Sequence, residues 1–199
     1  MDRGRGTQGP AGVVNWAGER GTRTLRLFYA LWPNDGCCAA LAAAAAPAIA
    51  QVVGQPVPPG NLHVTLAFLG MVPGRSLGDL VSVGGRGTWP AVELAFARIE
   101  YWVEPKVLVA LPSEVPAAGC AMVDRLWQGL EPLGFQREQR PWQPHLTLVR
   151  RIRRPPPDDL DIAPFAGRGP GPAWRLALVE SSSYPGGVRY KPLADWPLA

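Results

Sequence analysis

The chain contains little cysteine, little histidine and no long apolar run. Its three cysteines, Cys37, Cys38 and Cys120, are odd in number and have no CxxC spacing. This argues against a disulfide framework and against a cysteine-based metal site. Such a composition fits a reducing cytoplasm, where we expect the protein to be located. No apolar stretch is long enough to cross a bilayer, so no membrane association is expected.

Charge is also modest. The net charge is +4 and no run of five or more like charges exists. A mild basic excess favours anionic partners such as phosphates, although it also fits simple solubility. The densest basic stretch is Arg150, Arg151, Arg153 and Arg154, where the last three fit a solvated loop that attracts RNA weakly.

The apolar fraction is 47%, which is ordinary for a globular chain and argues against disorder throughout. Residues 1–22 lack the apolar core of a secretion signal. We expect them to be a disordered N-terminal extension, or the result of a start site placed too early. Residues 23–199 are long enough for a single domain with a real core.

Strand and helix patterns alternate from Thr24 onward. Strands are expected at residues 25–32, 62–69, 92–102, 106–111, 145–149, 174–181 and 188–193. Helices are expected at 37–53, 116–133 and, more weakly, 76–83. Pro47 should bend or split the first helix, and Gly70 should close the second strand.

The chain repeats itself once. Phe28-Tyr29-Ala30-Leu31-Trp32-Pro33 leads to a helix and then to His63-Val64-Thr65-Leu66. Val107-Leu108-Val109-Ala110-Leu111-Pro112 leads to a helix and then to His145-Leu146-Thr147-Leu148, at nearly the same spacing. Two such halves can pack around a pseudo-two-fold axis. The repeat therefore predicts an α+β fold with two pseudo-symmetric lobes of antiparallel sheet, flanked by helices, around a central cleft.

Both histidines of the chain lie in an H-x-T-L segment, although threonine is scarce. Residues i and i+2 of a strand face the same side. His63 should therefore lie beside Thr65, and His145 beside Thr147, with Val64 and Leu146 turned into the core.

Two facing imidazoles can act as an acid–base pair near neutral pH, and two hydroxyls can donate to a shared anion. A phosphodiester needs such a set, so the pattern predicts metal-free phosphodiester chemistry. Two other interpretations of the pair exist. Each histidine could be a partly buried structural residue, or the pair could bind zinc, for which two ligands are too few.

Arg150 lies five residues after His145. Strict strand alternation places it on the opposite face, unless the strand ends or bulges first. It is either a solvent-facing residue or a contact for a phosphate or a base. Phe28, Tyr29 and Trp32 could stack a nucleobase, but core packing is the favoured interpretation.

The segments RLFYALWP, NLHVTLAFLG and QPHLTL resemble the signature segments of the two-histidine (2H) phosphoesterase superfamily. Within it they are most similar to the RNA 2',3'-cyclic phosphodiesterases, also called 2'-5' RNA ligases. The similarity extends over about residues 24–198.

The resemblance implies hydrolysis of an RNA terminal 2',3'-cyclic phosphate to a 2'-phosphomonoester, without metal or cofactor. His63 would be the general acid and His145 the general base. Thr65, Thr147 and Arg150 would bind the substrate phosphate. The same site run backwards would join RNA ends through a 2'-5' linkage.

The expected partner is RNA with a 2',3'-cyclic phosphate end, and the expected state is a monomer. Two alternatives remain open. The substrate could be another diester, such as 2'-5' oligoadenylate or a cyclic ADP-ribose phosphate. The chain could instead be a non-catalytic RNA-binding module.

Overall fold

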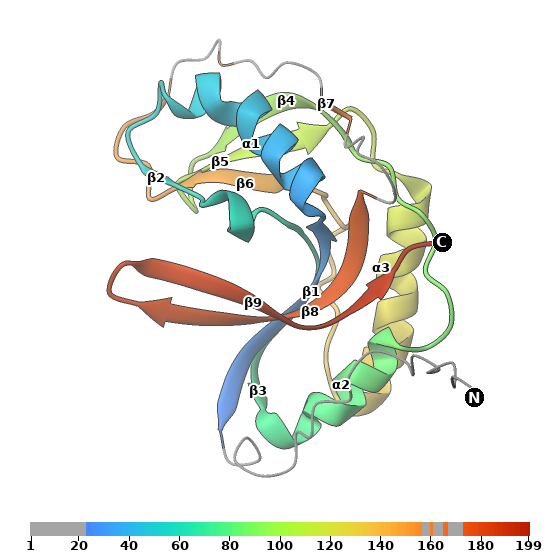
Figure 1. Ribbon diagram of the computed structural model, residues 1–199. Coiled ribbons are helices and arrows are strands. Elements are labelled where there is room, and N and C mark those ends of the chain that lie inside the picture. The colour runs from blue at the N-terminus through green and yellow to red at the C-terminus, as the bar shows by residue number, and fades with distance from the viewer. Residues whose placement is uncertain (1–22, 157–159, 161–164, 167–172) are drawn as a thin grey trace, which may run out of the picture.

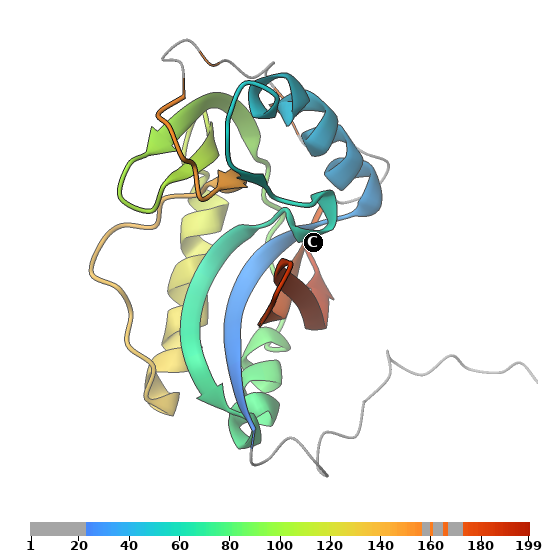
Figure 2. The same ribbon diagram turned by 90° about the vertical axis from the view of Figure 1, so that its left-hand side faces the viewer.

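The computed structural model describes residues 23–156, 160, 165–166 and 173–199. Two antiparallel sheets lie against each other and carry helices on their outer sides (Figures 1 and 2). The first sheet has the order β3-β1-β8-β9, with β1 (Thr24–Pro33), β3 (Val64–Pro73), β8 (Trp174–Tyr184) and β9 (Gly187–Pro197). The second has the order β2-β6-β5-β4-β7, with β2 (Gln55–Pro56), β4 (Ala95–Trp102), β5 (Val107–Pro112), β6 (Leu146–Arg150) and β7 (Phe165–Ala166).

Three α-helices accompany the sheets: α1 (Asp35–Ile49), α2 (Leu77–Gly84) and α3 (Ala117–Leu130). Short 3-10 turns occur at η1 (Pro59–Asn61), η2 (Gly74–Ser76) and η3 (Glu131–Leu133). The predicted α+β class with two antiparallel sheets is thus confirmed. None of the helices in the described part of the chain has the length and apolarity needed to span a bilayer.

The internal repeat corresponds to two strand–helix–strand halves. In the first, β1 pairs with β3, and in the second, β5 pairs with β6, both antiparallel. The helices cross between the halves: α1 follows β1 but contacts β6 and β7, whereas α3 follows β5 but contacts β3 (Figure 1). Each half therefore covers part of the other half's sheet.

The first helix begins where the sequence predicts. The Asn34 side chain accepts a hydrogen bond from the backbone N–H of Cys37, as a helix N-cap does. The prediction that Pro47 splits the helix is wrong, because α1 continues to Ile49. Pro47 falls in the last turn, where few backbone hydrogen bonds remain to be lost, and the helix ends before residue 53.

The prediction that Gly70 closes the second strand is also wrong. Strand β3 continues to Pro73, and Gly70 has φ +70°. The pairing of β1 with β3 shifts register at this point, between Leu27 and Phe28. Gly70 therefore accommodates a bulge in a continuing strand, because glycine adopts positive φ without strain. The weak helix expected at 76–83 is confirmed as α2.

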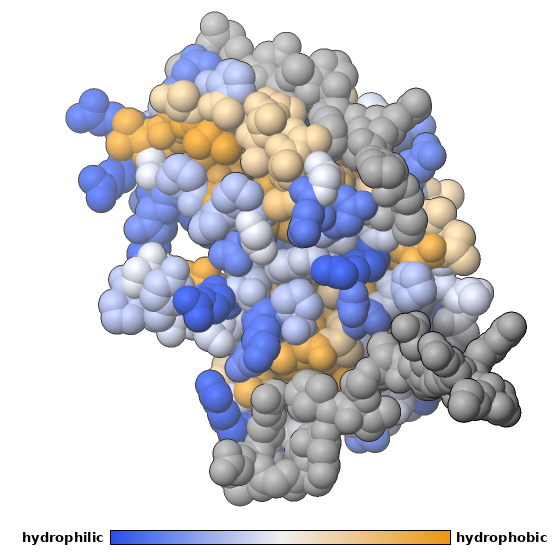
Figure 3. All heavy atoms as spheres, viewed as in Figure 1, coloured by the Kyte–Doolittle hydropathy of each residue, from blue (hydrophilic) through white to orange (hydrophobic). Residues whose placement is uncertain are grey.

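One hydrophobic core extends across both sheets, from Leu27 and Leu31 in β1 to Leu108 in β5 and Leu148 in β6. A second, small cluster occupies the other face of the first sheet and consists of Phe28, Ala30, Trp32, Ala177 and Val179. On the face shown in Figure 3, hydrophilic residues surround the β8–β9 hairpin. The small cluster forms the floor on which the site described next is built.

Candidate active site

The two H-x-T motifs occupy equivalent positions at the starts of β3 and β6. Val64 and Leu146 are buried, whereas the histidine and threonine on either side of each remain partly exposed. The predicted alternation is therefore confirmed. The charge of His145 contributes to the lowered pKa of His63, which means that the two imidazoles lie near each other.

Both imidazoles are held in the same way. Nδ1 of His63 donates to the backbone carbonyl of Asn61 over 2.7 Å, and Nδ1 of His145 donates to that of Gln143 over 2.9 Å. A carbonyl oxygen can only accept, so each Nδ1 carries the hydrogen. In both rings, Nε2 is consequently the atom that gains or loses a proton.

His63 lies in an aromatic enclosure. Its ring stacks on Trp32 at 5.8 Å and 13°, and lies 4.9 Å from the rings of Phe28 and Tyr190. Phe28 and Trp32 thus pack as expected, with their cluster directly below His63. Tyr29 faces the main core, where its hydroxyl donates to the carbonyl of Leu80.

A clamp connects His63 to the β8–β9 hairpin. The Asn61 side chain donates to the carbonyl of Val188 over 2.9 Å and accepts from the backbone N–H of Tyr190 over 3.3 Å. The backbone carbonyl of the same residue holds His63. Asn61 therefore fixes the ring of His63 and the strand that carries Tyr190 relative to each other.

Both histidines are harder to protonate than free imidazole. Burial lowers the pKa of His63 to about 4, and the charges of Arg150 and His145 lower it further, against the hydrogen bond to Asn61. Burial also lowers the pKa of His145, with Arg150 and Arg140 adding to the effect and the hydrogen bond to Gln143 opposing it. Without substrate, both rings are therefore mainly neutral at pH 7.

Arg150 lies on the side of the histidines because of a β-bulge. Between Leu108 and Val109 of β5, the pairing on β6 steps from Val149 to Thr147, so Leu148 is an extra residue. Leu148 and Val149 are accordingly both buried, and Arg150 returns to the face of Thr147. The sequence alone left this orientation open. The structure resolves it, since Arg150 affects both histidines.

The first half contains the same irregularity. Between Tyr29 and Ala30 of β1, the pairing on β3 steps from Ala67 to Thr65, so Leu66 is the extra residue. Phe68 is thereby the counterpart of Arg150, five residues after its histidine. Its side chain is 44% exposed, and the Arg26 guanidinium lies 5.0 Å from its ring centre.

A pocket of about 350 Å³ lies beside His145. It is bounded by Thr65 and Phe68 of β3 and by Trp102 of β4, whose ring is 4.6 Å from that of His145. The segment after α3 closes it with Arg140 and Trp142. The indole of Trp142 donates to the carbonyl of Thr65 over 2.9 Å and so connects the segment to the first motif.

Sequence reasoning missed Asn61, Trp102, Trp142 and Tyr190 as site residues. Two of them precede the histidines by a few positions, and the others come from distant strands. No short motif marks them. Their positions depend on how the two sheets meet, which is visible only in the fold.

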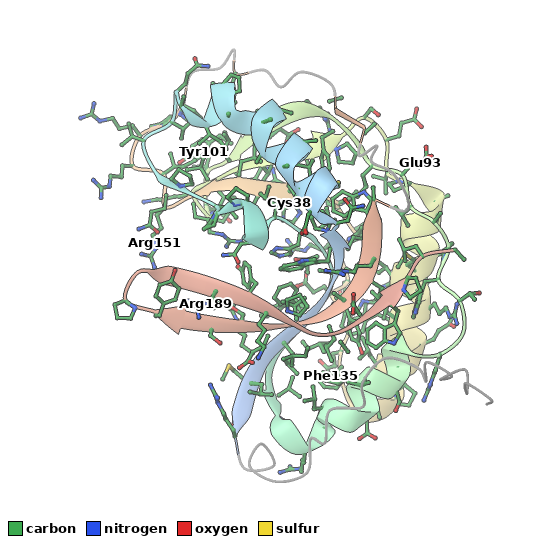
Figure 4. All side chains as sticks on the ribbon, in the orientation of Figure 1. Cys38, Glu93, Tyr101, Phe135, Arg151 and Arg189 are labelled. Carbon is green, nitrogen blue, oxygen red and sulfur yellow. The ribbon has the colours of Figure 1, made fainter. Side chains whose placement is uncertain are left out.

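The basic loop after β6 lies at the outer edge of the site. Arg151, Arg153 and Arg154 are exposed, as expected for a solvated loop. Figure 4 shows Arg151 and Arg189, the latter on the β8–β9 hairpin, on the same side of the molecule. Within the described residues, no three His, Cys, Asp or Glu side chains gather in a way that could hold a metal ion.

Two H-x-T strands that meet in a bilobal α+β fold define the class of two-histidine phosphoesterases. Solved structures share this fold. A crystal structure of E. coli LigT complexed with 3'-AMP is 27% identical, with a TM-score of 0.70, and the match covers 88% of this chain and 99% of that one. A crystal structure of a Thermus thermophilus protein is 28% identical, with a TM-score of 0.67, over 86% and 97% of the two chains.

Curated proteins extend the comparison. An RNA 2',3'-cyclic phosphodiesterase of Escherichia coli is 30% identical over 150 residues, which is 73% of this chain and 80% of that protein. Another, from Thermus thermophilus, is 30% identical over 190 residues, covering 87% and 90%. No protein-family model matches the chain. The chain belongs to the RNA 2',3'-cyclic phosphodiesterase (LigT) family of 2H phosphoesterases.

Proposed function

We propose that this protein hydrolyses the 2',3'-cyclic phosphate at an RNA end to a 2'-phosphomonoester, without a metal ion. The observation that carries the proposal is the matched pair of histidines. Each donates from Nδ1 to the carbonyl two residues before it, which leaves both Nε2 atoms for proton transfer. In-line opening of a cyclic phosphate requires one base and one acid on opposite sides of phosphorus.

In this mechanism, Nε2 of His145 removes a proton from water as the water oxygen attacks phosphorus. Nε2 of His63 gives a proton to the departing 3' oxygen. Thr65 and Thr147 donate to the non-bridging oxygens, and Arg150 balances the charge that develops on them. The family relationship supports these roles, and the pseudo-symmetry of the two motifs supplies one histidine and one hydroxyl from each half.

The unequal surroundings of the histidines favour His145 as the base. The attacking water must reach its base from solvent, and the pocket beside His145 offers that access. His63 is enclosed by aromatic rings. Its lowered pKa makes protonated His63 a strong acid, and the negative charge of a bound phosphodiester favours the protonated state.

The decisive experiment is incubation of the purified protein, in EDTA, with a short RNA ending in a 2',3'-cyclic phosphate. The product end is identified by its sensitivity to phosphatase and by its 2' or 3' position. We expect a 2'-phosphate. A 3'-phosphate would contradict the leaving oxygen, and activity that needs zinc or magnesium would contradict the metal-free mechanism.

The same assay compares substrates. Parallel reactions contain 2'-5' oligoadenylate and a cyclic ADP-ribose phosphate, and we expect the RNA cyclic phosphate to have the highest kcat/KM. A preference for either alternative would keep the mechanism but change the substrate. Tight RNA binding without turnover of any diester would overturn the enzymatic proposal.

A further inference from the structure

The pocket beside His145 lies on one side of the reaction centre. The residues that bound it include His145 and Thr65, but His63 is not among them. With the roles proposed above, His63 faces the leaving 3' oxygen, and His145 faces the attacking group on the opposite side of phosphorus. A group bound in this pocket is therefore on the side of the nucleophile.

The pocket has the dimensions and the chemistry for a nucleoside. Its volume of about 350 Å³ lies within the range of small-molecule sites, about 300–1,000 Å³. Phe68 offers an exposed aromatic face, and Trp102 connects the pocket to the ring of His145. Aromatic faces stack on any nucleobase, and arginines attract the phosphates attached to it.

The charges around the pocket are mainly positive. Arg26, Arg137 and Arg140 contribute, against the single carboxylate of Glu138. Arg140 is paired with Glu138 at 2.6 Å, Arg137 is paired with Asp124 at 2.7 Å, and Arg26 lies over the ring of Phe68. These contacts hold the arginines at the rim, where a phosphodiester chain would pass.

The pseudo-symmetry of the fold supports a specialised role for Phe68. The two bulges place Phe68 and Arg150 at equivalent positions, so both side chains are on the side of the histidines. The second half uses this position for a cation that affects both rings. The first half uses it for an exposed aromatic ring beside the base.

We infer that this pocket is an acceptor subsite, which binds a nucleoside with a free 5'-hydroxyl and presents that hydroxyl to His145. The inference rests on the proposed function and extends it to a second substrate. The 5'-hydroxyl loses its proton to Nε2 of His145 as the O5'–P bond forms. The P–O3' bond breaks, and O3' takes a proton from His63. The product is a 2'-5' phosphodiester with a free 3'-hydroxyl.

The test uses the full-length protein, an RNA with a 2',3'-cyclic phosphate end, and the 5'-hydroxyl dinucleotide ApA with a blocked 3' end as acceptor. Methanol in a parallel reaction supplies a nucleophile that needs no subsite. We expect the joining rate to saturate with ApA concentration. A joining rate that stays linear up to the solubility limit of ApA would overturn the inference.

Variants locate the subsite. Phe68→Ala and Arg140→Ala should each lower the ratio of ApA joining to methanolysis about tenfold, as expected for the loss of one stacking or charge contact. Met71→Ala is the matched control, because Met71 lies on the same strand, is 65% exposed and does not bound the pocket. Unchanged ratios in both pocket variants would overturn the inference.

Two further readouts separate this inference from the proposed function. A higher KM for the cyclic-phosphate RNA in Phe68→Ala, with no change for ApA, would mean that the pocket holds the donor, and would overturn the inference. Equilibrium dialysis of labelled ApA measures the subsite without turnover. Binding that Phe68→Ala weakens, in a protein that hydrolyses no cyclic phosphate, would support the subsite while the proposed function fails.

Discussion

The two halves of the molecule carry the same H-x-T-L segment and the same bulge, yet they surround their histidines differently. His63 is enclosed by three aromatic rings and held by the Asn61 clamp. His145 touches one ring, that of Trp102, and opens onto a pocket. Symmetry of backbone thus supplies two equivalent imidazoles, and the asymmetry of their neighbours assigns them different work.

The largest effect is expected from removal of either imidazole. His63→Ala and His145→Ala should each lower kcat about 10²–10⁴-fold, the usual contribution of one general acid or base. Steady-state kinetics on the cyclic-phosphate RNA measures this loss. Circular dichroism controls for folding, and near-normal rates in both variants would refute the acid–base pair.

Removal of Arg150 should have the next largest effect. Arg150→Ala should lower kcat/KM about 10–100-fold, the amount expected for a hydrogen bond to a charged group. It should also move the pH optimum upward, because the charge of Arg150 lowers the pKa of both histidines. Arg153→Ala, an exposed neighbour in the same basic loop, is the control and should change kcat/KM less than about threefold. Equal losses in the two variants would mean that Arg150 acts only as one more surface charge.

The clamp offers a matched comparison between the halves. Asn61 and Gln143 both hold a histidine through the backbone, but the Asn61 side chain also bonds to Val188 and Tyr190. Asn61→Ala should lower the free energy of unfolding by about 1–2 kcal/mol. Gln143→Ala, which removes an exposed side chain, should stay within about 0.5 kcal/mol. Denaturant titration of both variants gives the two values, and equal losses would show that the halves are braced alike.

The smallest effect concerns pH. Catalysis needs one proton shared between the two histidines, and that state is most populated between their pKa values. Both pKa values are lowered, so kcat/KM, which reports the free protein, should peak below pH 6.5 and fall as pH rises. The bound phosphate raises both, so kcat should peak at higher pH. A kcat/KM maximum above pH 7.5 would contradict this.

The sequence predicted the parts of the site that follow from strand periodicity. The doubled motif identified His63 and His145, and alternation placed Thr65 and Thr147 beside them. Alternation failed for Arg150 because the extra residue, Leu148, changes which side of β6 the later residues face. A signal was present: Leu148 and Val149 are consecutive apolar residues, and so are Leu66 and Ala67 in the other half.

Other features could not be read from the chain. Pro47 and Gly70 are breakers by composition, but their effect depends on the position of Pro47 in its helix and on the bulge that Gly70 accommodates. The Asn61 clamp and the pocket join segments that are far apart in sequence. Such contacts depend on how the sheets pack, and local propensity carries no information about that packing.

The exchange of helices between the halves has a mechanical consequence. Helix α1 grips the second sheet and α3 grips the first, much as two protomers hold each other in a domain-swapped dimer. A hinge that parted the sheets would strip apolar surface from both helices at once. We therefore expect this protein to act as a rigid mould rather than a jaw, with its two imidazoles already spaced for phosphate before RNA arrives.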